Sequence, residues 1–313
     1  MLTRLGNAAA RWAARTNPWT NVYGTARTLV ALASLGTLLF SSSGTLFCPA
    51  AGIPEVPHVD TLLQRLGLFG LLATHLELAR ALAILILAVT ASGWRPRLTA
   101  PLHWWVAFSF QASATTIDGG DQLCAILALL LLPVALTDPR RWHWSEAAPR
   151  PSPRRELMLR LVALSALAVI RLQVAGIYFH ASVAKFAVAE WKDGTAMYYW
   201  FTDPAFGAPP WLRPFLLPLL ENGITVSLMT WIPLALEVAL FMALTMPRRR
   251  WAPLLVAGIA FHFGIALVQG LVSFSTVMTA ALILYLRPVE CPFATPLPAR
   301  RRIALWTTRS SAT

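Results

Sequence analysis

The chain has 313 residues and a formal net charge of +12, but only 13% of its residues are charged and 57% are hydrophobic. Soluble domains carry about 25% charged residues, so this composition excludes an ordinary soluble domain. A strong positive charge is also typical of nucleic-acid-binding proteins. Here, however, the arginines stand in short clusters between long apolar runs and form no single patch. We therefore expect an integral membrane protein with no nucleic-acid partner.

Eight apolar runs follow one another along the chain. A hydrocarbon core about 30 Å thick needs roughly 20 apolar residues in a helix, so the runs predict an all-α bundle of about eight transmembrane helices. The first run lacks a small-residue cleavage site, and we expect it to remain as a span. The predicted spans cover residues 24–43, 66–92, 102–117, 122–137, 157–186, 224–246, 252–269 and 271–286.

The arginines predict how this bundle is oriented. An eight-span count places most basic residues in the two tails and in the loops after even-numbered spans. Lysine and arginine gather on the cytoplasmic side of membrane proteins. Residues 1–23 and 287–313 are therefore predicted to be cytoplasmic tails of one membrane domain, residues 24–286. Residues 187–223 form the longest outer loop, and their aromatic residues and prolines predict an interfacial or re-entrant lid.

Ionisable side chains inside the predicted spans are costly and are expected to face the bundle interior. Glu77 and Arg80 are three residues apart on one helix and can pair. Together with Arg171 and Glu237, they are predicted to form structural ion pairs that fix helix packing.

Lys185 and His262 are the candidates for a direct chemical role, because a lysine among apolar helices can act as a base. The alternatives are that Lys185 extends toward the membrane surface and that His262 makes only an interhelical hydrogen bond. His180 is five residues from Lys185, which places the two about 140° apart around a helix.

A tight outer turn is predicted at Asp118-Gly119-Gly120-Asp121. The glycines permit the turn and the two acids cap the next helix, although a weak cation or substrate-amine site is the alternative. The three cysteines show no metal-ligand spacing and no CxxC motif, so neither a metal site nor a structural disulfide is expected at Cys48, Cys124 and Cys291.

Several segments together carry a resemblance to a known family. Between about residue 17 and residue 287 the chain resembles the sporulation-delaying protein B (SdpB) family. That family is similar to the broader HTTM group, whose domain also forms the membrane part of vitamin K-dependent gamma-glutamyl carboxylase. The resemblance rests on NPWTNVYG (17–24), GWRPR (93–97), HWW (103–105), IDGGD (117–121), IYFHASVAK (177–185), EW (190–191) and DGTA (193–196).

The resemblance implies a role in maturing a secreted antimicrobial peptide toxin. Such a protein acts with a small partner protein, among membrane lipids, in a bacterial plasma membrane. Lys185 stands where the carboxylase has the lysine thought to act as base toward vitamin K hydroquinone, and Phe261-His262 resembles a second carboxylase motif. The resemblance thus implies Lys185 and His262 as catalytic candidates, and the substrate-binding candidates are His180, Trp191, Asp118 and Asp121.

The chain differs from the carboxylase in two ways, so a shared fold does not imply the same reaction. The Asp118–Asp121 turn stands where the carboxylase has a further histidine, and no segment is long enough for its large lumenal domain. The reaction and any cofactor therefore stay open. One alternative is an HTTM-type quinone- or lipid-linked membrane enzyme, and another is a non-enzymatic peptide exporter, receptor or immunity protein. No HExxH or serine–histidine–aspartate pattern supports a protease.

Overall fold

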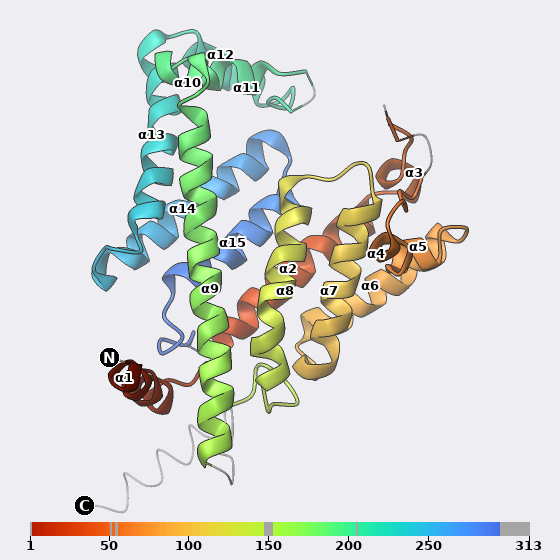
Figure 1. The fold of residues 1–313 in the computed structure, drawn as a ribbon. Helices are drawn as coiled ribbons and strands as arrows, with labels where there is room; N and C mark the ends of the chain where they lie inside the picture. Colours follow the sequence, from red (N-terminus) through yellow and green to blue (C-terminus); the bar gives the residue numbers. More distant parts are fainter. Residues whose placement is uncertain (1, 51, 54–55, 147–152, 205, 295–313) are drawn as a thin grey trace, which may run out of the picture.

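The computed structural model describes residues 2–50, 52–53, 56–146, 153–204 and 206–294, which fold into helices with no strands in these ranges (Figure 1). In chain order the helices are α1 (Leu2–Arg15), α2 (Asn21–Phe40), α3 (Ser43–Leu46), α4 (Leu62–Arg65), α5 (Leu68–Leu71), α6 (Leu76–Ser92), α7 (Pro96–Ser113), α8 (Gly119–Thr137), α9 (Pro153–Lys185), α10 (Ala189–Asp193), α11 (Ala196–Thr202), α12 (Arg213–Leu220), α13 (Gly223–Met242), the 3₁₀ helix η1 (Arg248–Arg250), α14 (Trp251–Gln269) and α15 (Val272–Leu286).

Each predicted span corresponds to one of the longer helices: α2, α6, α7, α8, α9, α13, α14 and α15. Five of the helical segments are long and apolar enough to cross a membrane, namely α2, α8, α9, α13 and the continuous segment Arg248–Gln269. The chain is therefore a membrane protein with an all-helical fold. The count of eight spans and the sides of the two termini stay predictions.

The second span differs most from its predicted range, residues 66–92. Two short helices, α4 and α5, occupy its first part, and α6 begins only at Leu76. Gly70 permits this arrangement, because a Cβ atom there would lie 2.1 Å from the carbonyl oxygen of Gln64. An apolar run in sequence thus contains a backbone reversal that only the close approach at glycine allows.

The helix α9 is the longest element of the fold. Its 33 residues extend over about 50 Å, which exceeds the thickness of a hydrocarbon core. The predicted N-terminal tail contains α1, which packs against α9 through hydrogen bonds from Arg160 to the carbonyl oxygens of Ala13 and Ala14. Figure 1 shows α1 near one end of the bundle and running across the direction of α9.

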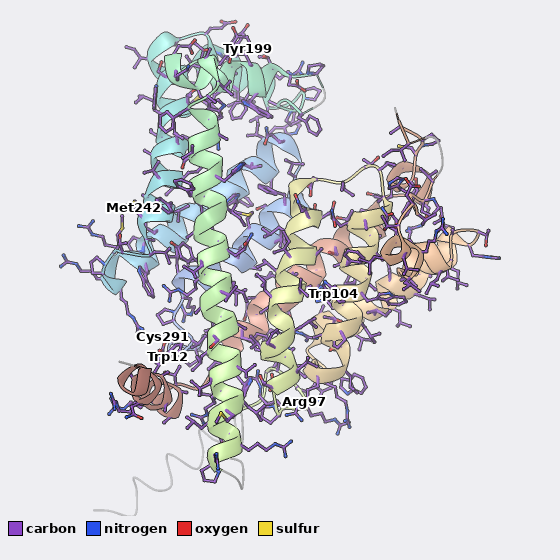
Figure 2. All side chains as sticks on the ribbon, in the orientation of Figure 1. Trp12, Arg97, Trp104, Tyr199, Met242 and Cys291 are labelled. Atoms are coloured by element: carbon purple, nitrogen blue, oxygen red, sulfur yellow. The ribbon has the colours of Figure 1, made fainter. Side chains whose placement is uncertain are left out.

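The two ends of the bundle carry different side chains. The predicted lid, residues 187–223, is built from α10, α11 and α12, which gather over the ends of α9 and α13 (Figure 1). Tyr199 lies at this end, whereas Arg97 and Trp12 lie at the opposite end (Figure 2). The lid and the arginine-bearing start of α7 therefore lie at opposite ends of the bundle, which is the arrangement that the predicted orientation needs.

Helix α2 lies in the middle of the bundle and contacts α6, α8 and α15. It presents small residues to them, and Gly24, Ala26 and Ala33 are buried. Small residues let helix backbones approach closely, which is the main way in which helices pack within a membrane.

Candidate functional site

A cavity of about 700 Å³ lies between α9, α13 and α14 beneath the short helices of the lid. Its lining is mainly apolar and aromatic, and four of the lining residues have charged, imidazole or amide side chains: Lys185, Glu237, His262 and Gln269. Helices α10, α11 and α12 contribute the side chains that cover it: Trp191, Met197, Trp200, Phe201 and Leu216.

Lys185 and Glu237 form an ion pair on the wall of this cavity. The Nζ atom of Lys185 lies 2.7 Å from Oε1 and 2.6 Å from Oε2 of Glu237. The carboxylate is 7% exposed and the lysine side chain 23% exposed, so the lysine is the more accessible partner. The same Nζ lies 5.1 Å from the ring centroid of Trp191, within reach of a cation–π contact. Lys185 at the end of α9, Trp191 on α10 and Glu237 on α13 thus come together from three helices.

His262 reaches the same cavity from α14 and is almost completely buried. Its Nε2 atom lies 3.0 Å from the hydroxyl of Tyr178 on α9. The Nδ1 atom has no hydrogen-bond partner among the described residues. Phe274 packs edge-on against the imidazole ring, with centroids 5.5 Å apart. The structure therefore brings together Lys185, His262 and Trp191, three of the residues singled out in the sequence.

Asp118 and Asp121 lie elsewhere, at the beginning of α8. They form a capping box, in which Asp118 accepts hydrogen bonds from the backbone N–H groups of Gly120 and Asp121, and Asp121 accepts one from Asp118 N–H. Gly120 allows α15 to approach, because a Cβ atom there would lie 2.7 Å from Cα of Phe274. The capping role expected for these acids is present, and neither acid lines the cavity.

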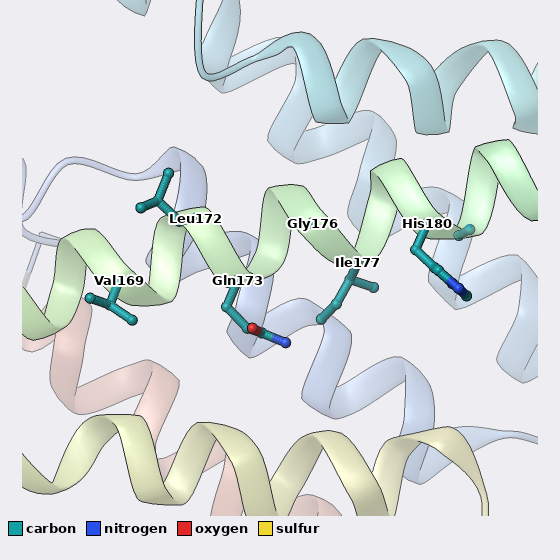
Figure 3. Close-up of a pocket in the computed structure, with 7 residues that line it drawn as sticks. Val169, Leu172, Gln173, Gly176, Ile177 and His180 are labelled. Carbon is teal, nitrogen blue, oxygen red and sulfur yellow. The ribbon is translucent and has the colours of Figure 1, made fainter.

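His180 lies on a different face of α9 from Lys185. It lines a separate hollow of about 570 Å³, together with Gln173 and Ile177. In Figure 3 the side chains of these three residues extend from the same side of the helix. The wide angular separation expected from their spacing thus keeps His180 away from the Lys185 cavity, and a substrate role for His180 stays a hypothesis.

The four residues expected in structural ion pairs behave differently from one another. Glu77 and Arg80 are in contact at 2.8 Å, but the carboxylate is largely exposed. Arg80 also donates to the carbonyl oxygen of Leu38, which links α6 to α2. Glu237 and Arg171 do not pair: Glu237 contacts Lys185, and the guanidinium of Arg171 lies over the ring of Trp251. Arg171 and Lys185 are 14 residues apart on α9, about 21 Å along the helix, so the carboxylate that contacts Lys185 is not at the level of Arg171.

The described cysteines are free, and no group of three potential metal ligands occurs within the described residues. Cys124 is buried, as a small core residue would be, and Cys291 is exposed. Cys48 lies beside the hydroxyl groups of Thr115 and Thr116, whose hydrogen bonds lower the pKa of its thiol.

A second group of buried charges, which we call the sealed cluster, combines Arg27 of the first predicted span with three residues that were not expected to be buried: Asp138, Arg140 and His143. Asp138 and Arg140 form a bidentate ion pair, with distances of 2.8 Å from Nε to Oδ1 and 2.7 Å from Nη2 to Oδ2. Arg27 donates to the hydroxyl of Thr99 and to the carbonyl oxygen of Thr90, and therefore links α2 to α6 and α7.

A tight turn between α6 and α7 packs against the sealed cluster. Gly93, between α6 and α7, has φ of +89°, and a Cβ atom there would lie 2.4 Å from the ring of His143. The backbone N–H of His143 donates to the carbonyl oxygen of Gly93, and that of Arg95 donates to Arg141. The GWRPR segment therefore packs directly against residues 138–145, and only the glycine signals this contact in the sequence.

A family model and two similar proteins place the chain in the same family. The HTTM domain family matches residues 75–289. The uncharacterized protein YitO of Bacillus subtilis (strain 168) is 40% identical over 293 residues, which are 93% of this chain and 92% of that protein. Sporulation-delaying protein SdpB of the same organism is 37% identical over 276 residues, which are 88% of this chain and 83% of that protein. No solved structure matches the chain.

The matched range contains both the cavity wall and most of the sealed cluster, since Lys185, Glu237, His262 and Asp138 all fall between residues 75 and 289. It covers more than half of the chain, and the similarity to SdpB extends over most of both proteins. The chain therefore belongs to the HTTM domain family, as an SdpB-like membrane protein.

Proposed function

We propose that this membrane protein takes part in a sporulation-delaying toxin pathway by maturing a secreted peptide precursor at the cavity beside Lys185. The observation that carries the proposal is the Lys185–Glu237 ion pair on the wall of an otherwise mainly apolar cavity. The similarity to sporulation-delaying protein SdpB supports the choice of pathway.

The cavity suits an apolar segment of a peptide that carries polar backbone groups. A protonated lysine has three N–H donors, and two of those of Lys185 are directed at Glu237. The third donor is available to an acceptor in the cavity, such as a backbone carbonyl oxygen of the precursor. The Trp191 ring beside Nζ fixes the position of the ammonium group, and the pair can move a proton between lysine and carboxylate without a net change in charge.

The lid helices give the precursor a route to this cavity. Met197, Trp200 and Phe201 of α11 line it from the end of the bundle where Tyr199 lies (Figure 2). In our proposal this end faces outward from a bacterial plasma membrane, and the peptide enters beneath the lid. A small partner protein would present the precursor or share in the reaction.

Mass spectrometry of the secreted peptide tests this proposal. The precursor, its small partner and this chain are coexpressed, and the chain is wild type, Lys185→Met, Lys192→Met or deleted. Lys192 is the matched control, because it is an exposed lysine of α10 that does not line the cavity. We expect the Lys185→Met variant to lower the yield of mature peptide by at least about tenfold, the effect of losing one charge-assisted hydrogen bond.

The amount of each variant in the membrane is measured in parallel, so that loss of protein is not read as loss of activity. A mature peptide of unchanged mass and yield in the deletion strain would contradict the maturation role and favour export, sensing or immunity. If the Lys185→Met variant is present at normal abundance and the peptide still matures normally, the cavity beside Lys185 is not the site of maturation. Copurification of a quinone or lipid with wild type, but not with Lys185→Met, would favour the lipid-linked membrane enzyme.

A further inference from the structure

A second site lies on the opposite part of the bundle, around the indole ring of Trp251 at the start of α14. The Cζ atom of Arg171, on α9, lies 4.2 Å from the ring centroid, and that of Arg248, in η1, lies 5.5 Å from it. The ring itself is nearly buried, and its N–H group donates to the carbonyl oxygens of Ala243 and Met246 near the end of α13. Three elements thus hold two guanidinium groups around one fixed aromatic ring.

Positive charge at this place is poorly balanced. Among the described residues, no carboxylate and no hydrogen-bond acceptor contacts the guanidinium of Arg171, although it is only partly exposed. Arg248 has one weak partner, Glu290 at 3.9 Å, and both side chains of that pair are exposed (66% and 37%). Exposed Arg249 and Arg250 follow directly, and the N-terminus of α14 adds partial positive charge.

The position along α9 fits the level of lipid headgroups. Arg171 precedes Lys185 by 14 residues, which is about 21 Å along a helix. A hydrocarbon core is about 30 Å thick, and an arginine side chain can extend several ångströms further toward the headgroups. With Lys185 near one surface, the backbone of Arg171 lies about 9 Å short of the other, and the extended guanidinium approaches that surface, where a tryptophan such as Trp251 is also favoured.

We propose that Arg171 and Arg248 bind the phosphate group of an anionic membrane lipid beside Trp251. A guanidinium presents its N–H donors as a fork that matches phosphate oxygens, and two such forks around one ring leave donors free for a shared anion. The acyl chains of the lipid would lie along the apolar surfaces of α9 and α14. The lipid phosphate neutralises Arg171, which no carboxylate contacts among the described residues, and Arg248, whose one contact with Glu290 is long and exposed, and it ties α9 to the α13–α14 turn.

Native mass spectrometry of the full chain in detergent tests the site. The probes are phosphatidylglycerol, phosphatidylcholine and inorganic phosphate, each titrated against wild type, Arg171→Gln, Arg248→Gln and Arg97→Gln. Arg97 is the matched control, since it is an exposed arginine of α7 away from this ring (Figure 2). The double variant Arg171→Gln/Arg248→Gln is titrated in the same way. We expect phosphatidylglycerol to bind wild type and Arg97→Gln equally, and to bind the double variant at least about tenfold more weakly.

Three results would overturn the proposal. One is equal binding of phosphatidylcholine and phosphatidylglycerol, and another is unchanged phosphatidylglycerol binding in the double variant. The third is displacement of phosphatidylglycerol by millimolar inorganic phosphate, which would assign the site to a free anion. If Arg171→Gln fails to fold, the binding measured for Arg248→Gln is the test. The side chain of Arg248 is 66% exposed, so replacing it leaves the core intact.

Discussion

The sealed cluster and the cavity pair show two ways of keeping charges inside a helical bundle. In the sealed cluster, the side chains of Asp138 and Arg140 are 0% and 2% exposed, and the arginine also donates to the carbonyl oxygens of His143 and Ser145. Nearly every hydrogen-bonding position of this pair is therefore occupied by protein. The pair connects the end of α8 to the loop that follows it, and it lines neither of the two cavities described above.

The pair of Lys185 and Glu237 has a similarly short contact but a different environment. One wall of the pair is protein and the other is a cavity of about 700 Å³. Lys185 keeps a free donor, and neighbouring His262 has a ring nitrogen with no partner in the described structure. Full hydrogen bonding makes a rigid structural element, whereas incomplete hydrogen bonding beside a cavity leaves groups that a ligand can use.

The largest effect is expected from Asp138→Asn. The substitution keeps the shape of the side chain but leaves the guanidinium of Arg140 buried without its counter-charge. Breaking a buried ion pair in this way costs about 3–5 kcal/mol of the free energy of unfolding. Denaturation of the protein in detergent micelles, followed by circular dichroism, measures the change.

The matched control is Glu290→Gln, which removes a carboxylate from the exposed contact with Arg248. We expect its free energy of unfolding to change by less than about 0.5 kcal/mol, because exposed ion pairs contribute little. Equal effects of the two substitutions would show that the sealed cluster is accessible to water, and the contrast with the cavity would then be lost.

A smaller effect is expected from acid, through His143. Arg27 can only donate, so Nδ1 of His143 accepts at 3.4 Å and Nε2 carries the hydrogen, which it donates to Thr28 at 3.3 Å. Burial, assisted by the charges of Arg27 and Arg140, lowers the pKa of His143 to about 2. The folded protein therefore keeps this histidine neutral at every moderately acidic pH.

Above pH 6.5, the ordinary pKa of histidine in an unfolded chain, the histidine is neutral in both states and protonation takes nothing from the free energy of unfolding. As the pH falls below that value, the unfolded chain binds a proton that the folded protein does not, so the free energy of unfolding decreases by about 2 kcal/mol at pH 5. Unfolding measured at pH 7.5 and pH 5 tests this. His143→Gln should lose that part of the pH dependence, whereas His58→Gln, at a part-exposed histidine beside Asp60, should keep it. Identical pH dependence in wild type and His143→Gln would contradict the buried neutral state.

Hydrophobic runs were enough to predict the main helices, because each predicted span corresponds to a helix. They also drew attention to Lys185 and His262, since ionisable residues are rare in apolar segments. Composition carried no information about the reversal at Gly70, which depends on a contact with Gln64. A run of apolar residues therefore predicted a longer span than α6 provides.

The pairing of charges was less predictable than their presence. Arg171 and Glu237 were both expected in structural ion pairs, but Arg171 lies over Trp251, whereas Glu237 pairs with Lys185 about 21 Å further along α9. Asp138 and His143 lie in a segment between two spans, where no periodic pattern marks which side chains fold back into the bundle. Such contacts follow from tertiary packing, so the sealed cluster could be found only in the structure.

The smallest effect is expected at the cavity, from Glu237→Gln. The amide still offers an oxygen to Nζ of Lys185, and the lysine can be solvated from the cavity, so we expect the free energy of unfolding to fall by only about 1 kcal/mol. Lys185→Met should cost more, because it leaves the carboxylate of Glu237, which is 7% exposed, without its cation. The double variant Lys185→Met/Glu237→Gln should recover much of that loss, and a double-mutant cycle measures the coupling. A coupling as large as that between Asp138 and Arg140 would mean that the cavity pair is also a structural lock. A coupling energy much smaller than that between Asp138 and Arg140, together with loss of peptide maturation in the Lys185 and Glu237 variants, would mean that this pair serves ligand binding and not stability.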